Sequence, residues 1–508
     1  MRTLIDNFLN RTTMYRLVMY VLSGLTLAAI ALSFFGLLPY SPFMLAFSVI
    51  LMTAVCLVTN VIFAKIFRAP TNVESLYISA LILVLIITPP KSLLDGQFLE
   101  TAIWASLIAM VSKYILAIGK KHIFNPVALA VGITALALNQ SASWWVGTLW
   151  MMPFVLIGGV LIVRKIRRSN LVFGFIIAAL VAILGVYLAT PLLMPNILWN
   201  VCISTPLFFF AFVMLTEPLT TPPTKGLQIA YGALVGVLFA PWVHIGSFYF
   251  TPEIALLTGN LFSYIVSPKQ KLLLTLREKV MVATDTYDFR FTADKKLPFH
   301  PGQYLEWTLA HGHPDNRGNR RYFTIASSPT EQNIDIGVKF YPKSSSYKKD
   351  LLEMQPGDTL VASQLSGDFT MPNDTTKKLV FVAGGIGVTP FRSMIKYLLD
   401  TKERRDIVLL YSNRTQSDIA YKDVFDEAQQ VGIKTVYTLT DQKATLPDWK
   451  GYTGYIDRQM IEKEIPDYRD RHFFLSGPHS MIIAFEQTLH DMGIGRSQIK
   501  KDFFPGFA

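Results

Sequence analysis

Ten apolar stretches follow one another along the first 268 residues of the chain. Most of them are long enough for a helix to cross the hydrocarbon core of a membrane, which takes about 20 residues. Charged side chains are concentrated in the short connections between them. The pattern therefore predicts a polytopic α-helical membrane domain of about ten spans. The stretches lie at roughly 15–37, 42–64, 75–90, 99–117, 123–139, 144–163, 171–190, 196–216, 227–246 and 251–266.

Three of these stretches, the third, the fifth and the tenth, are short for a complete span. Proline or asparagine stands at or near their ends, in Pro89-Pro90, in Asn125-Pro126, and in Pro252 with Asn260. A broken helix leaves backbone groups unpaired, so it survives in a membrane only where protein or a polar cavity surrounds it. We therefore expect half-helices at these three places.

After Pro268 the pattern changes to short strands separated by turn residues. Residues 272–374 are expected to form a small β-barrel. Beyond them, continuous apolar strands alternate with amphipathic helices, as in a parallel α/β sheet. We expect three domains, at 1–268, 272–374 and 375–508. The strands predicted in the last domain lie at 378–383, 407–411, 434–440 and 472–475.

The net charge of +11 comes almost entirely from the apolar part. Residues 1–271 carry 16 Lys or Arg against six Asp or Glu, whereas residues 272–508 carry 31 against 30. The bases cluster on alternate connections between the apolar stretches, and the opposite connections carry one base, Lys91. By the positive-inside rule, both termini and everything after residue 268 are expected in the cytoplasm, in a multi-pass protein of the cell inner or plasma membrane. Charge distributed in this way indicates topology and not a nucleic-acid partner.

The two cysteines, Cys56 and Cys202, lie within apolar stretches and are expected to be small buried residues. The sequence predicts no disulfide, no metal site and no iron–sulfur ligand set. No cleavable signal peptide is expected either, because the first apolar stretch is too long and lacks a small-residue cleavage pattern. A haem-based ferric reductase is excluded, since it needs four histidines within its spans and the apolar part offers only His122 and His244.

The stretch Arg321-Tyr322-Phe323-Thr324 places a cation, aromatic rings and a hydroxyl on one short β-rich run. In an extended chain Arg321 and Phe323 face one way, and Tyr322 and Thr324 face the other. A ring beside a hydroxyl suits a flat heterocycle, and the arginine fork suits a diphosphate. Taken alone, these residues would fit a plain surface strand equally well.

This stretch resembles the Arg-x-Tyr-Ser/Thr flavin motif of the ferredoxin–NADP reductase family. The resemblance implies that Arg321, Tyr322, Phe323 and Thr324 bind FAD, with Thr324 as a candidate catalytic hydroxyl at the flavin edge. Ser345 and Ser346 stand before a predicted helix at 348–354, where hydroxyls and N–H groups suit a phosphate. The family holds the flavin diphosphate at this place. Lys339, on the strand after the motif, is a further candidate for cofactor binding.

A glycine-rich loop, residues 384–390, connects an apolar strand to a predicted amphipathic helix from about residue 391 to 399. Glycines let the backbone approach a pyrophosphate closely, and the helix N-terminus supplies N–H groups and positive potential. Such a loop alone is weak evidence, but its place between strand and helix strengthens the assignment. The candidates for binding NADH or NADPH here are Gly384, Gly385, Gly387, Thr389 and Pro390.

The resemblance to the reductase family extends over about residues 272–508. The family often has Cys-Gly-Pro where this chain has Ser476-Gly477-Pro478, which implies that Ser476 is a second candidate catalytic residue near the nicotinamide and that Gly477 and Pro478 bind cofactor. No acid follows the second strand, so Arg414 favours NADPH slightly, although an exposed arginine is equally ordinary. The aromatic tail, which includes Phe504, either covers a flavin face or serves packing.

Asn125 and Thr216 place hydrogen-bonding groups at breaks in the apolar part, where a helix N-terminus suits a polar or anionic ligand. Helix capping is the strong alternative. The segments around them, with residues 256–262, resemble the NqrB/RnfD family, membrane components of the sodium-translocating NADH:quinone reductase and of the Rnf complex. The resemblance implies ten spans in inverted repeats and a flavin in the membrane. The family's Ser-Gly-Ala-Thr attachment stretch does not occur here, so an FMN or riboflavin would be held without a covalent bond.

The motifs together favour a membrane-bound oxidoreductase that takes hydride from NAD(P)H to FAD. Electrons would then pass to or across the bilayer, to a membrane flavin, a quinone or an extracytoplasmic flavoprotein, with partner proteins left open. The alternative is an ion pump or transporter whose cytoplasmic flavin domain powers or regulates it. The few acids within the apolar stretches argue against a proton relay and leave sodium open.

Overall fold

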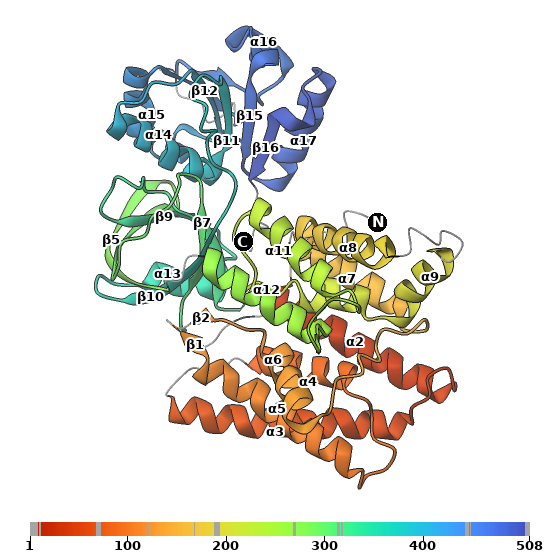
Figure 1. Ribbon diagram of the computed structural model, residues 1–508. Coiled ribbons are helices and arrows are strands. Elements are labelled where there is room, and N and C mark those ends of the chain that lie inside the picture. Colours follow the sequence, from red (N-terminus) through yellow and green to blue (C-terminus); the bar gives the residue numbers. More distant parts are fainter. Residues whose placement is uncertain are drawn as a thin grey trace. The chain divides into compact units, whose positions relative to one another are not determined.

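The computed structural model describes residues 9, 12–67, 73–118, 121–166, 168–186, 194–267, 271–311, 315, 318–441, 447 and 449–502. The chain divides into two compact units, an N-terminal unit of residues Met1–Gln270 and a C-terminal unit of residues Lys271–Ala508 (Figure 1).

Helices make up nearly all of the described N-terminal unit. Each of the ten predicted apolar stretches coincides with one helix, except the stretch at 196–216, which holds α9, α10 and η2. Short antiparallel pairs of strands, β1 (Ala117–Ile118) with β2 (Lys121–His122) and β3 (His244–Ile245) with β4 (Phe248–Tyr249), lie in the connections. The helices are α2 (Met14–Phe34), α3 (Pro42–Ile66), α4 (Val73–Ile86), α5 (Gly96–Ile115), α6 (Pro126–Leu138), α7 (Met152–Ile166), α8 (Ser169–Gly185), α9 (Met194–Ser204), α10 (Leu207–Phe209), the π-helical turn η2 (Phe210–Met214), α11 (Lys225–Leu238) and α12 (Pro252–Val266).

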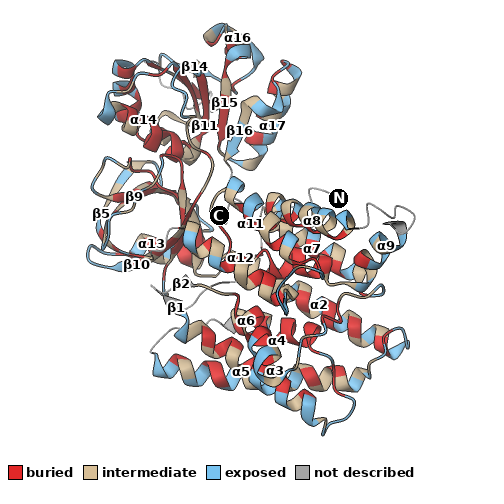
Figure 2. Ribbon diagram, in the orientation of Figure 1, coloured by how far each residue is buried: buried red, intermediate tan, exposed pale blue. Residues whose placement is uncertain are grey.

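Helix α3 shows how these helices pack. Leu45, Met52 and Cys56 recur at helical spacing and are completely buried, whereas Phe43 and Ile50 on other sides of the same helix are 72% and 69% exposed. Figure 2 shows a similar division of buried and exposed faces along several other helices of this unit, whereas residues 79–86 of α4 are buried on every side. A helix that is apolar on its exposed side as well as its buried side is typical of a lipid environment.

The helices differ in length from the ten predicted spans. Among the described helices, α2, α3 and α5 are each long and apolar enough to cross a membrane, and the bent pair Asn196–Ser204 with Leu207–Met214 makes a fourth candidate if it is one span. Short helices were predicted at α4, α6 and α12, and these have 14, 13 and 15 residues. Helices α7, α8 and α11, for which full spans were predicted, are short as well. No break was predicted in the interior of the stretch at 196–216, yet residues Asn196–Ser204 and Leu207–Met214 meet at an angle of 59°. Pro206, which has no N–H to donate, stands at this break.

The first half of the C-terminal unit is a six-stranded antiparallel sheet with the strand order β8-β7-β10-β5-β6-β9, which we call the antiparallel lobe. The two outer strands in this order are β8 and β9, so the sheet is a half-barrel where the sequence predicted a small β-barrel. Helix α13 (Ser346–Glu353) packs on its core through Tyr347 and Leu351. The strands are β5 (Leu272–Ala283), β6 (Thr286–Ala293), β7 (Tyr304–Thr308), β8 (Arg320–Thr324), β9 (Ile334–Lys339) and β10 (Thr359–Ser366).

The second half is a six-stranded parallel sheet with the order β14-β13-β12-β11-β15-β16, the parallel lobe. Alternate side chains of its central strands enter two separate cores, one formed with α14 and α15 and the other with α16 and α17, so helices cover both faces. The four predicted strands all form. The elements are β11 (Leu379–Gly384), the 3-10 turn η3 (Gly385–Val388), α14 (Thr389–Thr401), β12 (Ile407–Asn413), α15 (Lys422–Glu427), β13 (Ile433–Leu439), β14 (Tyr452–Thr453), α16 (Arg458–Glu464), β15 (His472–Ser476), α17 (His479–Asp491) and β16 (Ile499–Asp502).

Candidate functional site

Arg321 and Phe323 share one face of β8, as the alternation of a strand predicts. The guanidinium carbon of Arg321 lies 4.9 Å from the centre of the Tyr347 ring, and the Phe323 ring lies 6.1 Å from the same ring. Arg321 is only 5% exposed, and it donates to two backbone carbonyl oxygens at 2.7 and 3.2 Å. Because Tyr347 is the second residue of α13, the cation is fixed beside the start of that helix, next to Ser345 and Ser346.

The start of α13 already holds an anionic group. Ser345 is the N-cap residue and accepts the backbone N–H of Lys348 at 3.3 Å. The backbone N–H of Ser346 donates to the Asp315 carboxylate at 3.0 Å, and its hydroxyl contacts His311 Nε2 at 3.1 Å. A carboxylate at this N–H, with Arg321 close by, indicates a place that stabilises negative charge. The residues therefore fit the predicted diphosphate of FAD.

Tyr322 and Thr324 lie on the opposite face of β8. Tyr322 donates its hydroxyl hydrogen to the Glu306 carboxylate at 2.8 Å, and its ring meets the Tyr304 ring edge-on at 5.7 Å. Thr324 is directly paired with Tyr304 on β7 and is 5% exposed. The predicted ring and hydroxyl are thus side by side, and Glu306 fixes the tilt of the Tyr322 ring. Sequence reasoning missed Glu306, although a carboxylate in an otherwise apolar strand was a usable signal.

Lys339 was predicted to bind cofactor, and in this structure it contacts an acidic residue of the parallel lobe. Its ammonium group forms an ion pair with the Asp418 carboxylate at 2.7 Å, across to the parallel lobe. Burial acts to raise the pKa of Asp418, but the hydrogen bonds from Lys339 and Thr415 outweigh it, so the pKa is lowered. Lys339 therefore joins the two lobes in this structure.

The glycine-rich loop follows β11 and forms the turn η3. Gly385 has a left-handed backbone, with φ +51°, and a Cβ built on it would meet nothing within 4 Å. On the other side of the loop, a Cβ on Gly387 would lie 2.6 Å from the Cα of Gly477. The loop is thus open at Gly385 and tightly packed at Gly387, which fits a backbone that a pyrophosphate approaches from one side only.

Ser476 and the glycine-rich loop meet at a switch in the strand order. β11 pairs with β12 on one side and with β15 on the other, so the sheet extends from it in two directions. In open parallel sheets, ligands bind outside the carboxyl ends of strands at such a point. Gly384 ends β11, and Ser476 ends β15 and is 4% exposed. Pro478 is the N-cap residue of α17, so the whole predicted Ser476-Gly477-Pro478 turn lies in this region.

Thr389 and Pro390 begin helix α14, as the first turn of the predicted pyrophosphate-binding helix. The Thr389 hydroxyl donates to the carbonyl of Ile386 at 3.3 Å. Its methyl carbon lies 2.9 Å from where a Cβ on Gly337 of β9 would stand. The Thr389 side chain therefore contacts the antiparallel lobe, while Pro390 occupies an early helical position that needs no N–H donor.

Arg414 follows β12, as predicted, and its side chain is 78% exposed. Its Nε lies 3.6 Å from a carboxylate oxygen of Asp441, which follows β13. No acid directly follows β12, but the parallel pairing of β12 with β13 brings Asp441, which follows the next strand, beside Arg414. Phe504 lies outside the described residues.

The two membrane candidates make internal hydrogen bonds. The Asn125 side chain accepts the N–H groups of Val127 and Ala128 at 3.0 Å each and so caps α6. Its own N–H donates to the side chain of Asn260 at 2.8 Å. Thr216 donates its hydroxyl hydrogen to the carbonyl of Phe212 at 2.7 Å. Asn125 thus serves as a helix cap in this structure, whereas Thr216 bonds to a carbonyl oxygen four residues before it in its own chain.

Comparisons with known proteins agree with the two lobes. The family model of the oxidoreductase FAD-binding domain matches residues 273–370, and that of the oxidoreductase NAD-binding domain matches residues 381–487. Over 235 residues, the chain is 30% identical to the reductase component of glycine betaine monooxygenase from Chromohalobacter salexigens, covering 44% of this chain and 62% of that protein.

Over 202 residues it is 34% identical to the F component of the Na(+)-translocating NADH-quinone reductase of Methylococcus capsulatus, covering 37% of this chain and 49% of that protein. The chain thus spans less than two thirds of the length of these curated relatives. Among solved structures, the cytochrome P450 reductase GcoB of Amycolatopsis is 23% identical, with a TM-score of 0.42, over 46% of this chain and 70% of that one. The C-terminal unit carries an oxidoreductase FAD-binding domain followed by an oxidoreductase NAD-binding domain.

Proposed function

We propose that the whole chain is a membrane-bound reductase that takes hydride from NAD(P)H to FAD and passes electrons to or across the membrane. The observation that carries this proposal is the union, in one chain, of an FAD- and NAD-binding module with a helical unit whose outer surface is apolar. The proposed domains are a membrane domain at 1–268, an FAD domain at 272–374 and an NAD(P)H domain at 375–508.

FAD, when bound, supplies the hydride and electron chemistry, and the protein supplies binding, orientation and electrostatics. In the proposed site, Arg321 and the start of α13 hold the diphosphate, with Ser345 and Ser346 at the helix start. The Tyr322 ring and the Thr324 hydroxyl face the flavin from β8. The glycine-rich loop would bind the nicotinamide dinucleotide, and Ser476, at the end of the adjacent strand β15, would lie near the nicotinamide.

For the N-terminal unit we propose a multi-pass membrane domain like those of the NqrB/RnfD family, with the C-terminal unit on the cytoplasmic side. A broken helix at Thr205-Pro206 and the meeting of α6, α11 and α12 at Asn125, Tyr231 and Asn260 support this comparison. The acceptor would be a non-covalent FMN or riboflavin near Asn125 and Thr216, a quinone, or an extracytoplasmic flavoprotein.

A redox-driven ion pump is the second candidate function. Lys113 on α5 donates to the hydroxyls of Ser75 and Ser79 on α4 at 3.0 and 2.9 Å, within the apolar unit. Ionisable groups inside membrane domains often mark ion or substrate paths, so this observation favours translocation.

The test uses the full-length protein in lipid vesicles. Anaerobic NADH or NADPH should bleach the visible absorbance of the bound flavin, and a water-soluble acceptor inside the vesicles or a quinone in the bilayer should restore it. A chain whose flavin stays oxidised with both donors would contradict the proposed function. A sodium- or pH-sensitive dye inside the vesicles separates the two candidates, because only a pump builds an ion gradient during turnover.

A further inference from the structure

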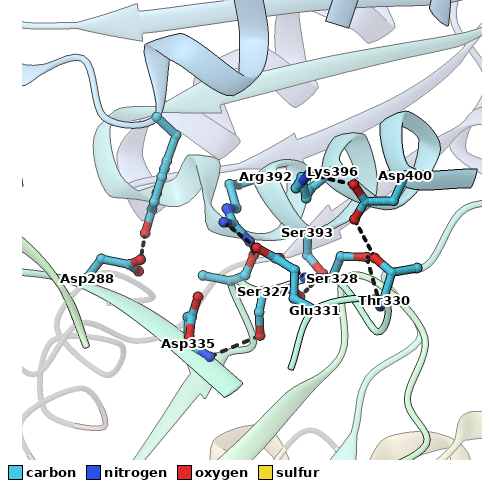
Figure 3. Close-up of polar contacts among 12 residues, drawn as sticks. Asp288, Ser327, Ser328, Thr330, Glu331, Asp335, Arg392, Ser393, Lys396 and Asp400 are labelled. Carbon is cyan, nitrogen blue, oxygen red and sulfur yellow. Dashed lines mark hydrogen bonds and ion pairs between the residues drawn. The ribbon is translucent and has the colours of Figure 1, made fainter. Parts of the chain in front are cut away.

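Arg392, in the second turn of α14, reaches across to the antiparallel lobe. Its Nη1 donates to the carbonyl oxygen of Ala326 at 3.0 Å. Its Nη1 and Nη2 also form a bidentate ion pair with the two carboxylate oxygens of Glu331. The guanidinium side chain is only 8% exposed. Figure 3 shows Arg392 and Glu331 pointing toward each other between the two lobes. A two-pronged contact between arginine and carboxylate fixes orientation as well as distance.

The neighbouring residue makes a second contact to the same segment. Ser393 donates its hydroxyl hydrogen to the carbonyl oxygen of Ser327 at 2.6 Å, and it is completely buried. Arg392 and Ser393 are thus attached to Ala326 and Ser327, consecutive residues of the antiparallel lobe. We call these four residues with Glu331 the lobe clamp.

The place of the lobe clamp in the sequence gives it a consequence for the site. Ala326 comes two residues after Thr324, the last residue of the flavin strand β8. Arg392 comes three residues after Thr389, where the glycine-rich loop enters helix α14. The clamp therefore connects the segment just after the flavin strand to the first part of the predicted nicotinamide-binding helix. Only two or three residues separate it from Thr324 on one side and from Thr389 on the other.

Other contacts leave the two lobes little room to slide. Tyr421 at the start of α15 donates its hydroxyl hydrogen to the buried Asp288 carboxylate of β6 at 2.8 Å. Gly337 of β9 lies against this side chain, and a Cβ there would stand 2.4 Å from the Tyr421 hydroxyl. Beside the clamp lies a cavity of about 360 Å³ with polar walls, among them Asp335 and Arg290. The interface around the clamp is therefore built from directional polar contacts.

We propose that Arg392 and Ser393 are positioning residues that set the distance and angle between the reduced nicotinamide and the flavin. This inference rests on the proposed function, since it concerns the hydride step of that same site. Reacting atoms need a separation of about 3–3.5 Å, and a misplacement of about 1 Å costs on the order of 100-fold in rate. Loosening α14 against Ala326 and Ser327 changes that separation without removing any residue that contacts either cofactor.

The experiment compares Arg392→Met, Ser393→Ala and the milder Glu331→Gln with the unaltered full-length protein. Arg471→Met is the matched control, because Arg471 is an equally buried arginine that pairs with Asp406 and Asp467 inside the parallel lobe. Flavin reduction is followed in a single anaerobic turnover at increasing NAD(P)H concentration. The limiting rate reports the hydride step, and its concentration dependence reports donor affinity. The long-wavelength charge-transfer absorbance reports contact between the two rings.

We expect Arg392→Met to retain FAD and donor affinity while the limiting rate falls by about 10- to 100-fold and the charge-transfer band weakens. Glu331→Gln and Ser393→Ala should show smaller losses of the same kind, and a deuterated donor should show a kinetic isotope effect at least as large as in the unaltered protein. Arg471→Met should keep both the rate and the band. Equal rate losses in Arg471→Met and the clamp variants, or an unchanged rate and band in all clamp variants, would overturn the inference. A lack of flavin reduction in the unaltered protein would instead contradict the proposed function itself.

Discussion

Asp335 on β9 is a buried carboxyl group that lacks a complete set of hydrogen bonds. It is 3% exposed, and its Oδ1 has no hydrogen-bond partner among the described residues. Burial is the main cause that raises the pKa of Asp335 to about 8, and the neighbouring Asp288 carboxylate adds to it. Arg392 acts in the opposite direction but does not cancel this effect. In the unfolded chain such a group loses its proton near pH 4 (about 3.9 for an ordinary aspartate). The folded protein therefore keeps a proton that the unfolded chain releases.

This difference makes stability depend on pH in a defined direction. Between about pH 4 and pH 8 the unfolded state binds fewer protons at this site, so stability falls as the pH rises, by at most about 1.4 kcal/mol per pH unit. Asp335→Asn removes the titration and should flatten the fall. The measurement is the temperature at which FAD fluorescence appears, recorded from pH 5 to pH 8. Parallel curves for Asp335→Asn and the unaltered protein would contradict the assignment.

Arg321 is predicted to hold the FAD diphosphate together with the start of α13. Arg321→Ala should purify with little FAD and show no reduction by NAD(P)H, because a buried cation beside Tyr347 is lost. Arg277→Ala is the control, since Arg277 is an exposed arginine on the same lobe. The ratio of flavin to protein absorbance measures the outcome. Full flavin occupancy in Arg321→Ala would remove this residue from the site.

At the scale of elements, the glycine-rich turn η3 offers a pair of contrasting substitutions. Gly387→Ala places a Cβ 2.6 Å from the backbone of Gly477, so η3 must move away from the end of β15, and overpacking of this kind costs about 1–3 kcal/mol. The Cβ of Gly385→Val meets no protein atom within 4 Å, but the side chain fills the open side of the loop, and its left-handed backbone costs about 1–2 kcal/mol.

We expect Gly387→Ala to lower the thermal midpoint more than Gly385→Val. Gly385→Val should keep its FAD and yet require far more NAD(P)H for reduction. Thermal unfolding and the concentration dependence of flavin reduction separate the two effects. If Gly385→Val binds the donor as the unaltered protein does, the pyrophosphate does not lie against this loop.

Local patterns predicted the elements well, because they depend on neighbours in the sequence. The apolar stretches all contain helices, and alternation on β8 placed Arg321 and Tyr322 on opposite faces. Pairing between distant strands was not predictable in this way. The half-barrel is open because β8 and β9 are the two edges of the strand order, and nothing in either strand alone reveals that. The break at Pro206 was also missed, although Ser204-Thr205-Pro206 interrupts the apolar stretch.

In the candidate site, too, local motifs were predictable from the sequence, whereas contacts between distant elements were not. The motifs around Arg321, Gly385 and Ser476 were found because their residue types and spacing carry the chemistry. Glu306 under Tyr322, Asp441 beside Arg414 and Glu331 against Arg392 come from other elements, and only the fold brings them together. These partners decide how a motif residue is held, so a sequence reading names ligands more readily than the groups that orient them.

At the scale of the whole molecule, the two units carry different surfaces for different surroundings. Large apolar side chains are exposed along most helices of the N-terminal unit, such as Leu27, Phe43 and Ile157 at 66–72%. In the C-terminal unit the exposed positions are mostly charged or polar, and its apolar residues lie in separate cores. These two surfaces are the ones that the proposed membrane-bound reductase requires.

The proposed topology makes a prediction about which connections face outward. Basic residues cluster on alternate connections of the N-terminal unit, so the connection near Lys91 should lie outside and the start of α11 inside. Ser92 and Gly226 are exposed residues at these two places, and Gly226 has open space for a side chain. In intact cells a membrane-impermeant maleimide should label Ser92→Cys, whereas Gly226→Cys should react only after the membrane is opened. Cys56 is buried, but the partly exposed Cys202 is replaced by serine in both variants to remove background labelling. Labelling of Gly226→Cys in intact cells would place the C-terminal unit's donor site away from the cytoplasm, and the proposed path of electrons from cytoplasmic NAD(P)H would be wrong.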